Sequence, residues 1–241
     1  MTETGVVHRL ATRRERVCFV LAIEASNPSI GGGGVCVARA ARGGLEVIGS
    51  AALGDTARAS DGVMIAVETA CRHAGVDASQ LGEIAVSVGP GGYTALRVAT
   101  TTAKTLAFAL ACPIVPVPSW SVAAESVAAA DRPALIAMAG KGGAAYLTAI
   151  DADGGADVLG VTAAEAVQPG MARTLVCDAH IPRPIADRCE ALGMARRPIA
   201  LSPDACVSCS AWYAPVAPEG IEPVYGREPD AVTQWRARQG G

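Results

Sequence analysis

A strand, a glycine-rich turn, a helix and a second strand follow one another between residues 84 and 118, and this order limits the possible folds more than any other feature. Residues 84–88 are an apolar run, interrupted only by Ser87, that ends at the turn 89–92. Residues 95–111 carry apolar side chains at helical spacing, and residues 113–118 return to extended structure. Two strands joined by a helix in this way lie parallel, with a right-handed crossover. The pattern predicts an α/β sheet with the turn at the carboxyl end of a strand.

The turn is a candidate anion site. Backbone amides and the helix dipole hold anions at such places, and open α/β sheets bind ligands at this edge. The turn lacks the lysine of a phosphate-binding P-loop and the third glycine of the dinucleotide fingerprint, so a plain strand-to-helix turn is the alternative. The residues of this phosphate- or nucleotide-facing loop are Gly89, Gly91, Gly92, Tyr93 and Thr94.

Antiparallel strands precede this unit, and a similar arrangement follows it. The expected first part is a hairpin over 17–38, a strand at 45–51 and a helix at 62–74. After Ser119 we expect a helix to residue 130 and a second hairpin of residues 134–138 and 145–150. A strand at 174–177 and a helix at 185–192 complete the expected elements. The chain therefore shows strands followed by helices twice.

Composition excludes several classes of protein. The chain has 241 residues, 51% of them hydrophobic, with 20 basic and 23 acidic side chains and a net charge of −3. This is not the charge of a nucleic-acid-binding protein, and the apolar content is too high for a disordered chain. No apolar run approaches the roughly 18 residues of a membrane span. The basic segment before residue 17 lacks a cleavage site, so we interpret residues 1–16 as a disordered arm and expect a cytoplasmic protein.

Eight cysteines lie scattered in apolar surroundings, which favours reduced core thiols over a disulfide framework. Cys206 and Cys209 form the single CxxC pair. Ser202 and Pro203 are typical of a helix start, so positions 206, 209 and 213 fall on one face of a helix. A buried helix stripe is one interpretation of this pair, and zinc binding or redox chemistry is the other.

Three segments resemble the bacterial TsaB (YeaZ) family: "LAIEASNPS" at 21–29, "IAVSVGPGGYTALRVATTTAKTLAFAL" at 84–110 and "EPVYGR" at 222–227. The resemblance spans roughly residues 17–230. It implies an actin-like ATPase (ribonuclease H-like) fold with two βββαβα-type halves, the second reduced. The halves would be residues 17–118 and 119–230, with a tail at 231–241.

The resemblance also implies a function. The family's members are noncatalytic paralogues of TsaD (Gcp-like), which adds the threonylcarbamoyl group to N6 of adenosine 37 in tRNAs that read ANN codons. The family acts by forming a heterodimer with TsaD, and meets the pathway ATPase TsaE and tRNA only through that complex. A homodimer in the absence of TsaD, and ATP or ADP at the interface with TsaD, stay open. No catalytic residue, no bound cofactor and no metal site are expected in this chain itself.

Two helices are expected to form the partner interface, at 62–74 and 95–111. The candidate contacts are Met64, Val67, Cys71, Ala99, Ala103 and Leu106. The alternative for each is a position in the chain's own core, because apolar helix faces are normally internal.

The chain departs from the family pattern at three places. Glu24 stands where the family has an aspartate, and Ala139-Gly140-Lys141 stands where the family reads Asp-Ala-Arg. A point-charge ammonium cannot replace the forked contact of a guanidinium. The family's basic-acidic-histidine stretch before the first helix is also missing, and Asp55 to Asp61 stand in its place. These departures weaken the expectation of small-molecule binding more than that of partner binding.

Two enzymatic hypotheses compete with the accessory role. An independent ATP-binding phosphotransferase or ATPase would use Glu24, the turn 89–94 and Lys104 or Lys141, but only the phosphate cradle of such a site is visible. A metalloprotease would need a paired-histidine motif, and the three histidines stand at no such spacing.

Overall fold

The computed structural model describes residues 19–27, 30–41, 44–54 and 59–226, together with Trp235 and Arg238. It divides into two compact units, residues 1–128 with 199–224 and residues 129–198 with 225–241. The expected boundary at 118/119 assigns residues 199–224 to the second half, whereas their contacts place them in the first unit. The expectations for residues 1–16 and for most of the tail lie outside the described residues.

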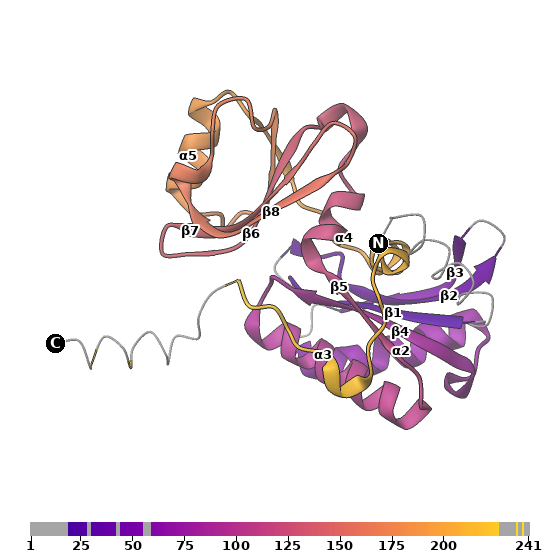
Figure 1. Ribbon diagram of the computed structural model, residues 1–241. Coiled ribbons are helices and arrows are strands. Elements are labelled where there is room, and N and C mark those ends of the chain that lie inside the picture. The colour runs from indigo at the N-terminus through magenta and orange to yellow at the C-terminus, as the bar shows by residue number, and fades with distance from the viewer. Residues whose placement is uncertain are drawn as a thin grey trace. The chain divides into compact units, whose positions relative to one another are not determined.

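The first unit is built on a five-stranded mixed sheet in the order β3-β2-β1-β4-β5 (Figure 1). Its strands are β1 Phe19–Glu24, β2 Gly34–Ala41, β3 Gly44–Ala52, β4 Leu81–Gly89 and β5 Ile114–Pro118. β1, β2 and β3 pair antiparallel, while β4 is parallel to both β1 and β5. The antiparallel meander and the parallel β-α-β unit that the sequence predicts are therefore confirmed.

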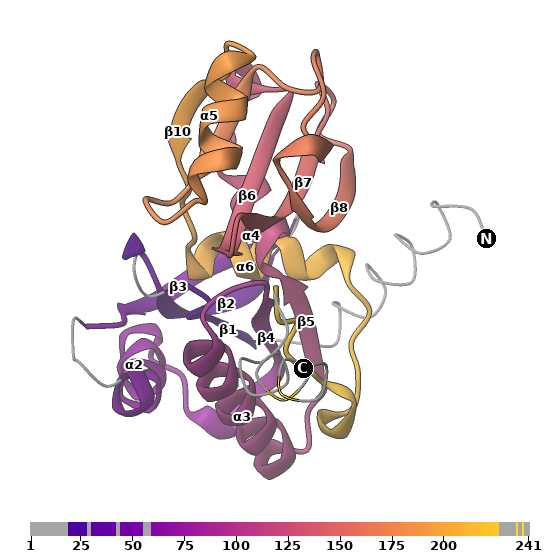
Figure 2. The same cartoon turned by 90° about the vertical axis from the view of Figure 1, so that its left-hand side faces the viewer.

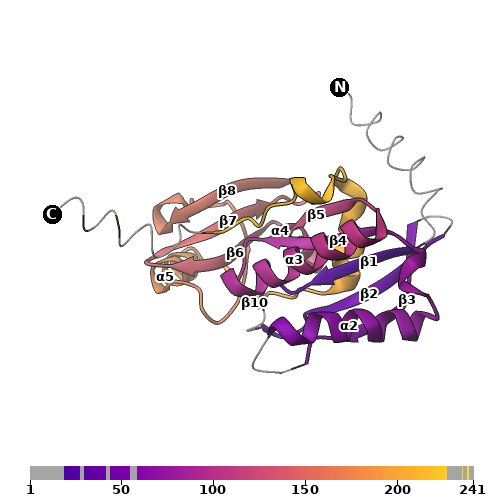
Figure 3. The same ribbon diagram turned by 90° about the horizontal axis from the view of Figure 1, so that it is seen from below.

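Helices cover both faces of this sheet, because its inner strands are mainly apolar on both faces. α2 (Ala59–Ala74) and α3 (Tyr93–Leu110) pack on one face, and α4 (Ser119–Glu125) and α6 (Pro203–Cys209) pack on the other (Figures 1 and 3). β1 and β4 are buried almost along their whole length. The helix expected to reach residue 130 ends at Glu125 and is followed by the 3-10 turn η3, Ala129–Asp131. A second 3-10 turn, η2 (Ala78–Gln80), leads into β4.

The second unit repeats the strand topology of the first, with the sheet order β10-β9-β6-β7-β8 (Figure 2). Its strands are β6 Ala134–Lys141, β7 Ala144–Ile150, β8 Ala156–Ala163, β9 Thr174–Cys177 and β10 Ala195–Pro198. β6, β7 and β8 are antiparallel, and β9 is parallel to both β6 and β10. The α5 helix (Arg183–Ala191) packs on this sheet around Ile185 and Cys189.

The reduction of the second half has a definite place. Between the third and fourth strands, the first unit has the 16-residue helix α2, whereas the second unit has only the 3-10 turn η4, Ala164–Ala166. The fold class that the sequence predicts, two βββαβα-type halves with the second reduced, is confirmed. Within the described ranges, no helix combines the length and apolar character that crossing a bilayer requires.

Candidate functional site

The glycine turn after β4 is packed tightly against the chain's own backbone. Gly89 has a φ of +111°, and a Cβ at this position would meet the carbonyl oxygen of Val224. A Cβ at Gly91 would meet the carbonyl oxygen of Ser26. Both approaches are under 3.0 Å, which real Cβ atoms do not tolerate. Glycine is therefore required here by close contact with backbone.

The amides of the turn also have partners within the chain. The N–H of Gly92 donates to the carbonyl oxygen of Ser26 at 2.7 Å, and the N–H of Gly89 donates to Oγ of Ser119 at 3.1 Å. The segment that covers the turn is itself held in place, because the N–H of Val224 donates to the carbonyl oxygen of Val88 at 2.7 Å. Two amides of the expected phosphate loop are thus already occupied.

Tyr93 and Thr94 begin α3, and both are exposed. The guanidinium of Arg97 lies 5.4 Å from the centroid of the Tyr93 ring and donates to its hydroxyl at 3.1 Å. Such a stacked and hydrogen-bonded pair stiffens the first turn of a helix. The phosphate-facing role of Gly89, Gly91, Gly92, Tyr93 and Thr94 stays a prediction, and the chain's own backbone leaves no room for a Cβ at Gly89 or Gly91.

A second glycine-rich turn, between β1 and β2, is filled in the same way. A Cβ at Gly32, which has a φ of +78°, would lie 2.8 Å from the carbonyl oxygen of Leu201. A Cβ at Gly33 would lie 3.1 Å from the carbonyl oxygen of Glu24. The segment that follows Ile199 therefore closes over this turn as Val224 closes over the other.

Glu24 ends β1 between the two turns and is only 1% exposed. Its Oε1 accepts hydrogen bonds from the N–H of Ser26 at 2.7 Å and from the hydroxyl of Ser26 at 2.6 Å. Burial raises the pKa of this carboxyl above 4.5, against the opposing effect of Ser26 and the Ser87 hydroxyl. Ser87 in turn shares a 2.7 Å hydrogen bond with Ser119. The result is a buried polar cluster, Glu24, Ser26, Ser87 and Ser119, in which only glutamate can ionise.

The two thiols of the CxxC pair lie in the core of the first unit. Cys206 is 0% exposed and its Sγ lies 3.9 Å from the carbonyl oxygen of Ile23, whereas Sγ of Cys209 donates to the carbonyl of Ser121 at 3.4 Å. Burial raises the pKa of both thiols. The helix start is as predicted, because Oγ of Ser202 accepts from the N–H of Ala205 at 3.1 Å. Tyr213 was expected on the same helical face, but α6 ends at Cys209 and Tyr213 has extended backbone.

In the described part of the chain, no group of three or more histidine, cysteine, aspartate or glutamate side chains could hold a metal ion. The ring of His73, the one histidine of α2, makes a 2.8 Å hydrogen bond with the carbonyl oxygen of Ser50 through Nδ1. The side chain of Lys141 lies outside the described residues. A Cβ at the neighbouring Gly140 would collide with the ring of Pro182, so this glycine is required by packing.

The expected partner contacts divide into buried and exposed positions. Val67, Cys71, Ala99 and Ala103 are between 0% and 6% exposed and belong to the core between the helices and the sheet. Their spacing is explained by packing within the chain. Leu106 is partly buried, and Met64 is 49% exposed. The interface itself stays a prediction, and Met64 is the member of the set whose side chain is mainly at the surface.

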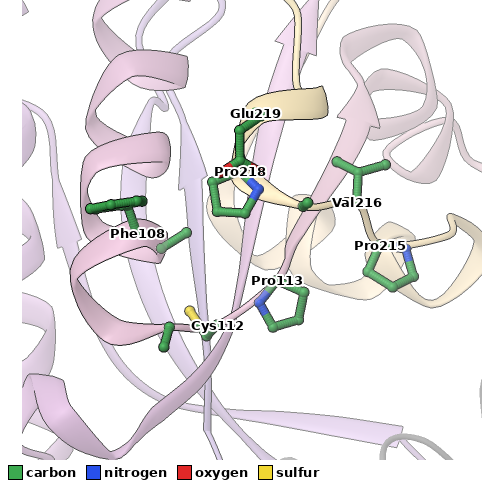
Figure 4. Close-up of a pocket in the computed structure, with 10 residues that line it drawn as sticks. Phe108, Cys112, Pro113, Pro215, Val216, Pro218 and Glu219 are labelled. Atoms are coloured by element: carbon green, nitrogen blue, oxygen red, sulfur yellow. The ribbon is translucent and has the colours of Figure 1, made fainter.

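Sequence reasoning missed two exposed apolar side chains on the same helices. Ile65 on α2 is 63% exposed, and Phe108 near the end of α3 is 76% exposed. Phe108 borders a surface groove of about 530 Å³, across from Val216 and Pro218, with Cys112 and Pro113 at its base (Figure 4). The sequence did indicate that both side chains are exposed, because both residues lie outside the apolar stripe of their helices. An isolated apolar residue on a polar face is, however, common and carries little information by itself.

A family model described as "TsaD: tRNA N6-adenosine threonylcarbamoyltransferase" matches residues 57–189. A tRNA N6-adenosine threonylcarbamoyltransferase from Streptococcus mutans is 33% identical over 108 residues, which are 44% of this chain and 32% of that protein. The chain thus matches about a third of the length of this relative.

Solved structures show the same fold. YeaZ from Pseudomonas aeruginosa superimposes with a TM-score of 0.63 at 20% identity, covering 86% of this chain and 100% of that chain. An uncharacterised protein with similarity to peptidase YeaZ, from the same organism, superimposes with a TM-score of 0.62 at 21% identity, over 87% of this chain and 99% of that chain. The architecture is therefore the actin-like ATPase fold as YeaZ has it. The family match covers more than half of the chain, so the chain belongs to the family of the tRNA N6-adenosine threonylcarbamoyltransferase TsaD.

Proposed function

We propose that this chain is a noncatalytic accessory subunit in the synthesis of threonylcarbamoyladenosine in tRNA. In this proposal a catalytic paralogue, TsaD, transfers the threonylcarbamoyl group to N6 of adenosine 37, and this chain acts by forming a heterodimer with it. The pathway ATPase TsaE and the tRNA meet the chain only through that complex. Any ATP or ADP would lie at the interface with the catalytic partner.

The observation that carries the proposal is the filling of both glycine-rich turns by the chain's own backbone. Carbonyl oxygens of Val224 and Ser26 occupy the space beside Gly89 and Gly91, and that of Leu201 closes over Gly32. Phosphoryl or acyl transfer at this edge of the sheet needs open space and free donors for the anion. A fold kept in this packed form is suited to binding a partner more than to binding a substrate. It favours the accessory role over an independent phosphotransferase.

The helices α2 and α3 supply a surface for the partner. Their inner faces are buried, yet Met64, Ile65 and Phe108 are 49%, 63% and 76% exposed. Large apolar side chains gathered on helices of this kind are typical of protein interfaces when they form a contiguous patch. The TsaD paralogue is the partner that family membership favours.

Co-purification with TsaD from the same cell tests the proposal. We expect Met64→Glu and Ile65→Glu to weaken binding of the full chain by at least about tenfold, because each places a charge in an apolar contact. Val161→Glu is the matched control, since Val161 is 52% exposed on β8 of the other unit. A complex that survives both helix variants would show that this face is not the interface.

Activity provides the second arm of the test. Formation of threonylcarbamoyladenosine by TsaD and TsaE should require this chain and fall with the two helix variants. ATP hydrolysis by the purified chain alone, abolished by Gly91→Val, would instead support an independent ATPase.

A further inference from the structure

The carboxyl group of Glu24 is enclosed without the partners that a charge requires. Its Oε1 accepts two hydrogen bonds from Ser26, but its Oε2 has no hydrogen-bond partner among the described residues and almost no exposed surface. The whole residue is 1% exposed. Burying an ionised carboxylate without a cation or water costs several kcal/mol or more, so such groups take up a proton or gain access to water.

The α6 helix is what covers this group on one side. It packs on β1, and its Cys206, fully buried, places Sγ 3.9 Å from the carbonyl oxygen of Ile23, the neighbour of Glu24. Burial raises the pKa of the Cys206 thiol, and a negative charge on Glu24 raises it further. The helix therefore lies close enough to Glu24 for the charge of Glu24 to act on the Cys206 thiol.

The other neighbours of Glu24 supply no compensating charge. From β4 the Ser87 hydroxyl faces it, and from its own strand end Ser26 does. Beyond Cys206 lie the thiols of Cys36 on β2 and Cys209 on α6, and the exposed carboxylate of Asp204 acts on Cys36. No cation and no second carboxylate contributes to the ionisation of Glu24 within the described chain. The titratable groups named here, the three thiols and Asp204, become negative on losing a proton.

We propose that Glu24 is a buried acid whose proton keeps α6 closed over the end of β1, and that loss of this proton opens α6. The device is a pH-sensitive latch within the first unit. Opening admits water to Oε2 and frees the thiol of Cys206 from the core. The proposal does not depend on the function proposed above.

The direction of the effect follows from linkage. The pKa of Glu24 in the folded protein is raised above the 4.5 expected of the unfolded chain, with burial as the main cause. The stability that this proton contributes is fully present below pH 4.5 and is lost as the pH rises through the folded value. Between pH 4.5 and the pKa of the folded protein, the loss of this single proton raises the unfolding constant by up to about tenfold per pH unit.

Glu24→Gln is the matched test, because the amide keeps the shape and the acceptor oxygen of a neutral carboxyl group. Urea unfolding of the full chain is measured at several pH values for wild type, Glu24→Gln and the exposed control Glu68→Gln. We expect the unfolding constant of wild type and Glu68→Gln to rise with pH by up to about tenfold per unit more than that of Glu24→Gln. Equal slopes in wild type and Glu24→Gln would overturn the proposal.

Hydrogen exchange locates the opening. We expect the opening constant of amides in residues 205–209 to increase with pH in wild type and to stay constant in Glu24→Gln, while α5 exchanges alike in both. Exchange in α6 that responds to pH equally in both proteins would overturn the latch. If Glu24→Gln does not fold, the carbon-13 carboxyl shift of Glu24 in wild type decides the question. A carboxyl ionised from pH 5 upward contradicts the proposal, and one that titrates together with α6 opening supports it.

Discussion

At position 91 a single methyl group would collide with backbone, and this makes the glycine a sensitive test of the packed turn. A Cβ at Gly91 would meet the carbonyl oxygen, the carbonyl carbon and the Cβ of Ser26, none of which is the end of a flexible side chain. Ser26 also accepts from Gly92, so it cannot move without loss of that hydrogen bond. We expect Gly91→Ala to lower the free energy of unfolding by about 1–3 kcal/mol, measured by urea denaturation.

Gly54→Ala is the control for this change, since no atom lies within 4 Å of the Cβ that would be added there. Its effect should stay within about 0.5 kcal/mol. Equal stability of the two variants would mean that the turn around Gly91 is open in solution.

The thiol of Cys36 gives a prediction of pH dependence. Burial, helped by the charge of Asp204, raises its pKa from 9.0 to about 12. The stability from this shift is complete below pH 9 and is lost as the pH rises through about 12. At pH 8 about one thiol in 10⁴ would be ionised. We expect native protein at pH 8 to resist alkylation at Cys36, read by mass spectrometry, while the urea-unfolded chain reacts. Fast reaction of the native protein would contradict this burial.

At the scale of whole elements, α3 shows how small side chains set the spacing between a helix and a sheet. Ala99, Ala103 and Ala107 are 0% exposed and lie in the core with β1 and β4. We expect Ala103→Leu to lower the free energy of unfolding by about 1–3 kcal/mol, because the larger side chain forces the helix off the sheet. Thermal or urea unfolding measures the change.

Ala109→Leu is the matched control on the exposed side of the same helix. It should change stability by no more than about 0.5 kcal/mol. If Ala103→Leu were as stable as this control, the stripe of Ala99, Ala103 and Ala107 would not be closely packed and would face something other than the core.

The elements that sequence reasoning found are those with a strong local pattern. β9 is confirmed at residues 174–177 because it is a short apolar run between polar segments, and it is buried throughout. β8 and β10 were missed. β8 alternates weakly, contains Gly160 and is largely exposed, and all four residues of β10, Ala-Arg-Arg-Pro, are exposed at a sheet edge. An edge strand pairs through its backbone on one side, so its side chains carry little signal.

The candidate site was harder to predict than the fold, for a different reason. The turn 89–92 was recognised from its place between a strand and a helix, a local property. Ser26 lies beside Gly91, but Val224 beside Gly89 and Leu201 beside the neighbouring turn belong to residues 199–224, which return to the first unit from far along the chain. Which backbone carbonyl lies beside a glycine depends on this long-range packing. The sequence could therefore predict the turn but could not show whether it was open.

At the scale of the whole molecule, charge sets the expected relation to RNA. The chain carries 20 basic and 23 acidic side chains, a net charge of −3. Neutralisation of phosphates supplies most nonspecific affinity for nucleic acids, and a chain of this charge has little to offer. We therefore expect the isolated protein to show no tRNA binding at low micromolar concentration in 150 mM salt, measured by filter binding or fluorescence anisotropy.

Addition of TsaD makes this prediction discriminating. If the chain meets tRNA only through the complex, affinity should appear when TsaD is present and should be lost with the interface variant Ile65→Glu, which leaves the net charge of TsaD untouched. A salt series separates tRNA binding through TsaD from tRNA binding by this chain alone. Each phosphate contact contributes about −0.9 to the slope of log K against log salt for a duplex. Submicromolar binding by the chain alone, with a steep slope, would place a tRNA surface on this protein and would contradict an indirect role.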